Sequence, residues 1–178
     1  MQHLDTGPGV CDEPAVDSSQ FVLNHTMLRI KDPERSLDFY TRILGMRLVR
    51  RLDFEEMGFT LYFLGFVPEE VAVEAPMDGP SRSQWTFSRP ALLELTHNWG
   101  TESDPSVQFH HGNSEPRGYG HIGISVPDID GLCAGLEQLG VAFTKRPQDG
   151  SMKGIAFICD PDGYRIELVE AERMGLGD

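Results

Sequence analysis

Residues 24–30 read NHTMLRI and residues 120–126 read GHIGISV, and the second segment is a version of the first. Both place a histidine in an apolar stretch that alternates as a β-strand does. Each is then followed by an aspartate that can cap a helix, an apolar pattern of helical period, and a glycine that can end the helix. These positions are Asp32 and Gly45 in the first half, and Asp128 and Gly140 in the second. The chain therefore contains an internal duplication.

The elements expected around the two segments give the order βαβββ twice, which is an α+β fold. In the first half we expect a strand at 21–30, a helix from Asp32 to Gly45, and strands at about 46–53, 58–66 and 90–96. In the second half we expect a strand at 120–126, a helix at 129–139, and strands at about 141–145, 154–159 and 164–169. The sequence Asp160-Pro161-Asp162-Gly163 is a turn that reverses the chain before the last strand.

The chain divides into two modules with terminal and connecting segments. Residues 1–20 lack periodicity and predict an N-terminal arm, loose or wrapped on a partner. The first module covers 21–97, and a Pro-, Gly- and Ser-rich insertion at 67–90 makes it longer than the second. A polar linker at 98–116 leads to the second module at 117–172, and a tail covers 173–178.

The composition is that of an ordinary soluble protein and excludes several partners. Hydrophobic residues make up 39% of the chain and charged residues 24%, and no apolar run is long enough to span a membrane. The formal net charge of −13 argues against nucleic acid and anionic membranes, since both need a basic surface. No secretory signal is visible, and Cys11, Cys133 and Cys159 form neither a disulfide framework nor a metal knuckle. We therefore expect the protein to reside in a reducing cytoplasm.

Each half also carries a carboxylate inside an apolar strand, Glu94 in ALLELT and Glu167 in RIELV. Taken singly, a glutamate there fits the solvent face of a strand whose apolar neighbours face the core, and His25 or His121 fits a structural hydrogen bond. As a set, the duplication supplies two nitrogens and two oxygens that can meet on one ion. Such a site suits octahedral Zn²⁺, Ni²⁺, Co²⁺ or Fe²⁺ with open positions, and a carboxylate ligand could act as general base.

Four segments closely resemble one known family: residues 21–51, 92–102, 112–124 and 152–167. The family is glyoxalase I, of the vicinal oxygen chelate superfamily, and the run from Glu94 to Gly100 is highly specific for it. The resemblance implies two βαβββ modules that pair into curved eight-stranded sheets across a homodimer. It also implies isomerisation of the methylglyoxal–glutathione hemithioacetal to S-lactoylglutathione through an enediolate, with no organic cofactor.

The resemblance further implies a role for individual residues. The metal-ligand positions are His25 and Glu94 of one subunit with His121 and Glu167 of the other, and the catalytic carboxylates are Glu167, as the base, and Glu94. The positions that hold glutathione are Arg29, Asn98, Arg117 and Lys145. Met152 belongs to a loop over the substrate, and the apolar pocket is formed by Phe54, Leu61, Phe63, Phe157 and Met174.

The choice of metal turns on His25. The N-terminal arm and the insertion before Glu94 resemble the long, eukaryotic-type enzymes, which prefer zinc but often have Gln at the first ligand position. A histidine there is typical of the shorter bacterial enzymes, which prefer nickel or cobalt. We give more weight to the overall architecture and expect one Zn²⁺ in each site, with Ni²⁺ or Co²⁺ as alternatives.

Two arginines can create a local positive site in this acidic chain. Arg29 follows His25 by four residues, on the same strand face, and Arg117 precedes His121 by four. Guanidinium groups pair with carboxylates bidentately, and glutathione carries two carboxylates. For either arginine alone, a solvated surface position is the ordinary interpretation.

Three further histidines are expected outside the site. His97 is an odd number of residues from Glu94, so in a regular strand it faces the other way and should make a structural hydrogen bond. His110 and His111 lie in the polar linker and should be surface residues.

Two other function classes remain open at this stage. An Fe²⁺ dioxygenase acting on a catechol would need only one carboxylate, and the second carboxylate with the flanking arginines counts against it. A non-catalytic ligand-binding module would bind its ligand without the metal quartet. Oxygen consumption with catechols would identify the first, and full affinity without metal would identify the second.

Overall fold

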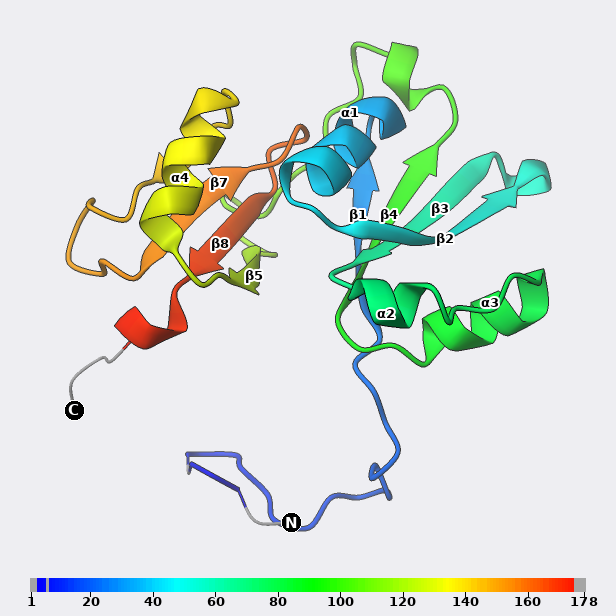
Figure 1. The fold of residues 1–178 in the computed structure, drawn as a ribbon, viewed down its shortest axis with the longest axis horizontal. Coiled ribbons are helices and arrows are strands. Elements are labelled where there is room, and N and C mark those ends of the chain that lie inside the picture. Colours follow the sequence, from blue (N-terminus) through cyan, green and yellow to red (C-terminus); the bar gives the residue numbers. More distant parts are fainter. Residues whose placement is uncertain (1–2, 6, 175–178) are drawn as a thin grey trace.

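The computed structural model describes residues 3–5 and 7–174, and it contains two four-stranded sheets built on the same plan (Figure 1). The first sheet has the strand order β1-β4-β3-β2 and the second β5-β8-β7-β6. Their bounds are β1 His25–Ile30, β2 Arg47–Phe54, β3 Phe59–Gly65, β4 Leu92–Asn98, β5 His121–Ser125, β6 Phe143–Lys145, β7 Ile155–Cys159 and β8 Arg165–Val169. In each sheet the first strand pairs in parallel with the last, and the other pairs are antiparallel. The expected α+β fold with two βαβββ modules is confirmed.

The helix in each module begins and ends as the sequence predicts. Helix α1 (Pro33–Asp38) continues as a π-helical turn (Phe39–Ile43), and α4 spans Ile129–Gln138. The Asp32 carboxylate accepts the backbone N–H groups of Glu34 and Arg35 at the start of α1, and the Asp128 carboxylate accepts that of Gly131 in α4. Gly45 and Gly140 have φ angles of 77° and 74°, the left-handed conformation that ends a helix.

The hydrophobic core lies between the helices and one face of each sheet. One continuous cluster includes Leu28, Ile30 and Leu95 from the first module and Ile158, Ile166 and Leu168 from the second. Tyr40 from the π-helical turn and Leu136 from α4 belong to the same cluster, so the two modules share one core. Since side chains alternate along a strand, the opposite face of each sheet is left for other residues.

The two modules are also joined by a polar contact. The Tyr40 hydroxyl, which is buried, donates to the Asp160 carboxylate at 2.8 Å. Asp162, from the same turn between β7 and β8, accepts the backbone N–H of Lys31 at 3.2 Å and the hydroxyl of Ser36 at 3.3 Å. The Asp160–Gly163 turn therefore reverses the chain as expected and also fastens the second module to the first.

The structure differs from the expectation in two regions of the first module. The first strand begins at His25 rather than residue 21, because its partner β4 begins only at Leu92. Within the expected insertion, two helices form, α2 (Glu69–Ala72) and α3 (Gly79–Phe87). Helix α3 is capped by the Asp78 carboxylate, which accepts the Ser81 N–H at 2.9 Å. The remaining short turns are Glu55–Met57, Thr101–Ser103 and Ala171–Arg173.

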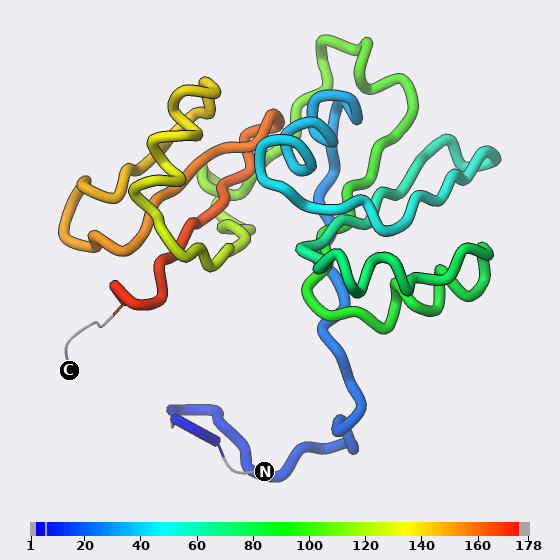
Figure 2. Tube along the Cα trace, in the orientation of Figure 1, coloured from blue at the N-terminus to red at the C-terminus, as the bar shows by residue number. Residues whose placement is uncertain are grey.

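The described part of the arm before β1 runs away from both sheets (Figure 2). Phe21, Val22 and Leu23 are exposed there. Among the described residues, no helix has both the length and the apolar character that crossing a membrane requires.

Candidate metal and substrate site

Each sheet brings one histidine and one glutamate together. His25 Nε2 lies 3.1 Å from Glu94 Oε2, and His121 Nε2 lies 3.2 Å from Glu167 Oε2. The cause is the strand register. Glu94 pairs across the ladder with Met27, and Glu167 with Gly123, two residues beyond each histidine and hence on the same face.

The duplication extends to the third strand of each sheet. Phe63 pairs with Glu94 across β3, and Phe157 pairs with Glu167 across β7. The Phe63 ring meets the His25 ring edge to face at 5.4 Å, and the Phe157 ring meets the His121 ring in the same way at 5.2 Å. In the structure, the duplicated unit therefore includes a histidine, a glutamate and a phenylalanine at equivalent positions of the two sheets.

The hydrogen bonds around His25 fit an imidazole that binds a cation through Nε2. Asn24 Nδ2 donates to the carbonyl oxygens of Thr86 and Arg89, so Asn24 Oδ1 must face His25 Nδ1, which is 2.6 Å away. That contact requires a proton on Nδ1, and in a neutral imidazole the Nε2 lone pair then points to the Glu94 carboxylate. Two electron-rich atoms 3.1 Å apart are stabilised by a cation beside them.

The separation of the donor atoms also fits a divalent ion. Two ligands about 2.1 Å from an ion and at right angles to each other are about 3 Å apart. Both His–Glu pairs have that spacing. Within one chain, the described residues contain no group of three or more His, Cys, Asp and Glu side chains able to hold a metal. Each module thus brings together one histidine and one glutamate, which is two of the four ligands expected from the sequence.

Both histidines line the same cleft between the modules. Its volume is about 530 Å³, and Leu23, Met46 and Tyr119 are among the other residues along it. The flanking strands β1 and β5 are the edges of their sheets, so each has one unpaired side.

Its strand neighbours alone would suggest that Glu94 faces water, but in the structure Glu94 is buried. Leu93 and Leu95 do face the core, but the residue Glu94 is only 9% exposed on the other face of the sheet. The Thr96 hydroxyl donates to Glu94 Oε1 at 3.0 Å. A carboxylate in that position needs polar or ionic partners.

The expected substrate residues of the first module share the face that carries Glu94. In the strand register, Asn98 lies opposite Phe59, and Leu61 lies opposite Thr96. Arg29 Nη1 donates to Asn98 Oδ1 at 3.0 Å, and the Phe54 ring stacks on Phe59 at 4.7 Å. Leu61 and Phe63 pack in one small apolar cluster.

The second module brings its expected residues together less completely. Lys145 Nζ donates to the carbonyl oxygens of Met152 and Ile155, both at 2.8 Å, and so closes the loop between β6 and β7. Arg117 lies before β5 in an irregular segment and pairs with Glu115 at 3.0 Å, so strand pairing does not bring it to His121. Met174 follows the Ala171–Arg173 turn at the end of the described chain.

Two residues near the site were missed in the sequence. Phe87, at the end of α3, contacts the rings of His25 at 6.3 Å and Phe63 at 5.2 Å. Its segment is rich in Gly, Pro and Ser and gave no helical signal. Asn24 had a signal, since a polar residue immediately precedes the first histidine but not the second.

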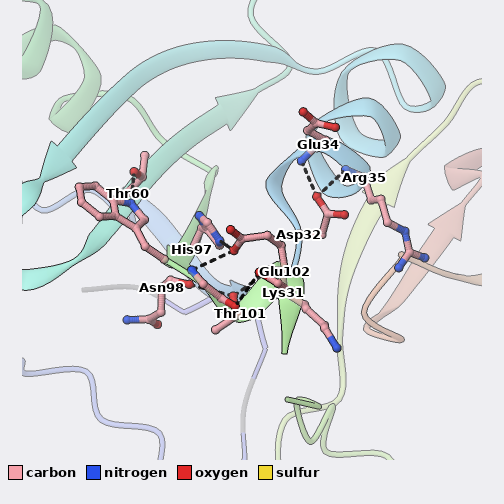
Figure 3. Close-up of polar contacts among 12 residues, drawn as sticks. Lys31, Asp32, Glu34, Arg35, Thr60, His97, Asn98, Thr101 and Glu102 are labelled. Carbon is pink, nitrogen blue, oxygen red and sulfur yellow. Dashed lines mark hydrogen bonds and ion pairs between the residues drawn. The ribbon is translucent and has the colours of Figure 1, made fainter. Parts of the chain in front are cut away.

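His97 and His110 and the cysteines lie as expected, whereas His111 is less exposed than expected. His97 points to the opposite face, and its Nε2 is 2.8 Å from Glu102 Oε2 (Figure 3). His110 is exposed and His111 is half-buried, with their rings stacked at 6.0 Å. The three cysteines are unpaired.

Comparison with known proteins identifies the family. The model of the Glyoxalase/Bleomycin resistance protein/Dioxygenase superfamily matches residues 22–168. A lactoylglutathione lyase of Pseudomonas aeruginosa is 56% identical over 97% of this chain and 96% of its own length. A glyoxalase I of Saccharomyces cerevisiae is 48% identical over 92% of this chain and 49% of its own length.

Solved structures agree with the sequence comparisons. A glyoxalase I from Leishmania major has a TM-score of 0.61 and 33% identity, covering 85% of this chain and 88% of its own. A glyoxalase I from Zea mays has a TM-score of 0.61 and 30% identity, covering 84% of this chain and 44% of its own. The duplicated His–Glu–Phe geometry and these likenesses lead to one conclusion: the chain belongs to the Glyoxalase/Bleomycin resistance protein/Dioxygenase superfamily, on its glyoxalase I branch.

Proposed function

We propose that this protein is a lactoylglutathione lyase, which isomerises the hemithioacetal of methylglyoxal and glutathione to S-lactoylglutathione and so detoxifies methylglyoxal. The observation that carries the proposal is the pair of His–Glu half-sites, equal in register and separation, in a chain 56% identical to a lactoylglutathione lyase. The chemistry needs one carboxylate to move a proton and several donors to hold a substrate with vicinal oxygens.

The residues fit one divalent ion in each complete site. We assign its ligands as His25 and Glu94 from one subunit and His121 and Glu167 from the partner, and Zn²⁺ as the ion, with Ni²⁺ or Co²⁺ as alternatives. When bound, the ion supplies a Lewis acid that lowers the energy of negative charge on the substrate oxygens. Asn24 contributes by fixing the orientation of the His25 ring.

Glu167 is the general base in this mechanism, because its side chain is more open to a ligand than that of Glu94. The exposed fractions are 22% for Glu167 and 12% for Glu94. Glu167 takes the proton from the carbon that bears sulfur, giving an enediolate, and returns it to the neighbouring carbon. One hydroxyl proton moves between the two oxygens, so the product is an isomer of the substrate.

The glutathione part of the substrate carries two carboxylates and needs cations in a chain whose net charge is −13. We assign this role to the Arg29–Asn98 pair, and to Arg117 and Lys145. The apolar lining that receives the methyl group and the thiol chain is formed by Phe54, Leu61, Phe63, Met152, Phe157 and Met174.

A second copy of the chain completes the site in this proposal. The two edge strands β1 and β5 flank a cleft of about 530 Å³ that contains both histidines. Leu23, which lines the cleft, is 84% exposed, and Met27 on the edge strand β1 is 43% exposed. Pairing a module of one subunit with the other module of its partner would cover these edges, form the eight-stranded sheets and unite the half-sites. We place the homodimer in the cytoplasm, which the three unpaired cysteines suit.

The test is removal and return of the metal. Isomerisation of preformed hemithioacetal, followed by thioester absorbance, should disappear after chelation and return with Zn²⁺, Ni²⁺ or Co²⁺. Metal analysis of the purified protein should give one ion for each subunit. Undiminished activity in metal-free protein would exclude the mechanism, and oxygen uptake with a catechol would point to a dioxygenase instead.

A further inference from the structure

The turn that follows β4 is held to β1 by one hydroxyl group (Figure 3). Thr101 Oγ1 lies 2.8 Å from the carbonyl oxygen of Lys31, just beyond β1, and 2.8 Å from the carbonyl oxygen of Asn98, the last residue of β4. A hydroxyl has a single proton, so it donates to one carbonyl at a time or shares its proton between them. In either case Thr101 bridges the ends of the two strands that carry Arg29 and Asn98.

The rest of the turn is anchored on its other sides. Trp99 Nε1 donates to Thr60 Oγ1 on β3 at 2.9 Å, and Thr60 in turn donates to Asp53 on β2 at 2.7 Å. Glu102 Oε2 accepts the N–H of Gly100 at 3.0 Å and lies 2.8 Å from His97 Nε2. The Thr101 contact is thus one part of a network that fixes the backbone next to Asn98.

The side chains that this network supports face the proposed substrate. Asn98 Oδ1 accepts from Arg29 Nη1 at 3.0 Å, which leaves the Asn98 amide nitrogen and the remaining guanidinium N–H groups as neighbouring donors. Such a pair fits the two oxygens of one carboxylate. Its geometry depends on where the ends of β1 and β4 lie relative to each other.

We propose that Thr101 is a positioning residue for carboxylate binding: its hydroxyl sets the separation of Arg29 and Asn98, and so the affinity for glutathione. The inference rests on the proposed function and adds a specific determinant to it. Thr101 Oγ1 contacts the carbonyl oxygens of Lys31 and Asn98, and it touches no reacting atom in this scheme. Its loss should therefore weaken binding and leave the proton-transfer step unchanged.

The first experiment compares Thr101→Val with Thr101→Ser in the full-length protein. The Kd of glutathione, measured by calorimetry, and the KM of the hemithioacetal should both rise about tenfold in T101V, with kcat within twofold of the unchanged protein. T101S keeps the hydroxyl and should restore both constants. Thr41→Val is the matched control, because it removes a hydroxyl–carbonyl bond of the same kind, to Leu37 at 2.6 Å in the first helix. Thr41→Val should leave Kd and KM unchanged.

The second experiment asks whether Thr101 acts through Arg29. In an Arg29→Met background, T101V should change the Kd of glutathione by less than twofold. A full tenfold effect in that background, a fall in kcat instead of a rise in KM, or the same loss in T41V would overturn the proposal. If the unchanged protein binds glutathione but does not isomerise the hemithioacetal, the proposed function fails, and the Kd cycle still decides the role of Thr101.

Discussion

His25 and His121 occupy equivalent places in β1 and β5, but their surroundings differ. The His25 ring is fixed by the Asn24 amide and flanked by Phe63 and by Phe87 from α3. Gly120 precedes His121, so no side chain corresponds to Asn24 in the second module. The side chains of the second pair are also more exposed, 41% and 22% against 32% and 12%. The duplication has thus given one more enclosed and one more open His–Glu pair, and the proposed mechanism assigns proton transfer to the more open pair.

The largest effects on activity are expected when the two glutamates are replaced in turn, and these variants test whether the two His–Glu pairs have different roles. Glu167→Gln should lower kcat by about 10²–10⁴-fold while the metal content stays near that of the unchanged protein, since the general base is lost. Glu94→Gln should instead weaken metal binding, and excess Zn²⁺ should recover much of its activity. Steady-state kinetics with metal analysis of each variant provides the measurement. If both variants lost the same activity and excess Zn²⁺ restored neither, the two glutamates would not have separate roles in metal binding and proton transfer.

The contact between the modules gives the second prediction, on stability. Burial raises the pKa of Asp160 from 3.8 to about 6, although the Tyr40 hydroxyl lowers it in part. Below about pH 3 this carboxyl is mostly neutral in folded and unfolded protein alike. As the pH rises from about 4 to about 6, the unfolded chain ionises first, so Asp160 costs the fold stability, by roughly 3 kcal/mol once it is fully ionised.

Asp160→Asn removes that titration. The free energy of unfolding of D160N, relative to the unchanged protein, should rise by roughly 3 kcal/mol between pH 3 and pH 7. Urea unfolding at several pH values measures this difference, and a constant difference across the range would contradict the prediction. Tyr40→Phe should raise the pKa of Asp160 further, because the hydroxyl that lowers it is lost. The loss of stability in this variant should therefore be larger at neutral pH than at acidic pH.

The smallest of these effects, on metal affinity, is expected from the residue before each histidine, which is Asn24 in the first module and Gly120 in the second. Asn24→Ala should weaken metal affinity by about 10- to 100-fold, because the His25 ring is no longer held. Gly120→Ala is the control at the equivalent place, where a Cβ meets no atom within 4 Å. Competition with a chromogenic chelator measures both affinities. If G120A weakens binding as much as N24A, the Asn24 amide has no special role in orienting the ring.

Local and repeated features could be predicted from the sequence. The start and the end of both helices were predicted correctly, because capping by an aspartate and the left-handed conformation of a glycine depend only on residues close in sequence. The approximate positions of the strands were predicted, apart from the start of the first. His97 was correctly expected on the face away from Glu94 with a structural hydrogen bond, and the structure shows Glu102 to be its partner. Duplication then placed equivalent residues at equivalent positions, which is why both His–Glu pairs could be anticipated.

Features that depend on distant contacts could not be predicted in this way. The burial of Glu94 depends on packing across the sheet, and helix α3 has a composition that resembles a loop. The Asp160 turn was recognised as a turn, but its bond to Tyr40 joins residues in different modules. The place of Arg117 beside His121 stays a prediction, because β5 begins at His121 itself and the four-residue spacing is informative only within a strand.

The parallel pairing of β1 with β4, and of β5 with β8, has a consequence for synthesis on the ribosome. Each histidine is made at the start of its module and each glutamate near the end, so β1 has no sheet partner until its whole module has been translated. Such long-range pairing is slow relative to the closing of local turns. Each His–Glu pair can therefore form only after its own module has been translated, and the first pair can form before the second module exists.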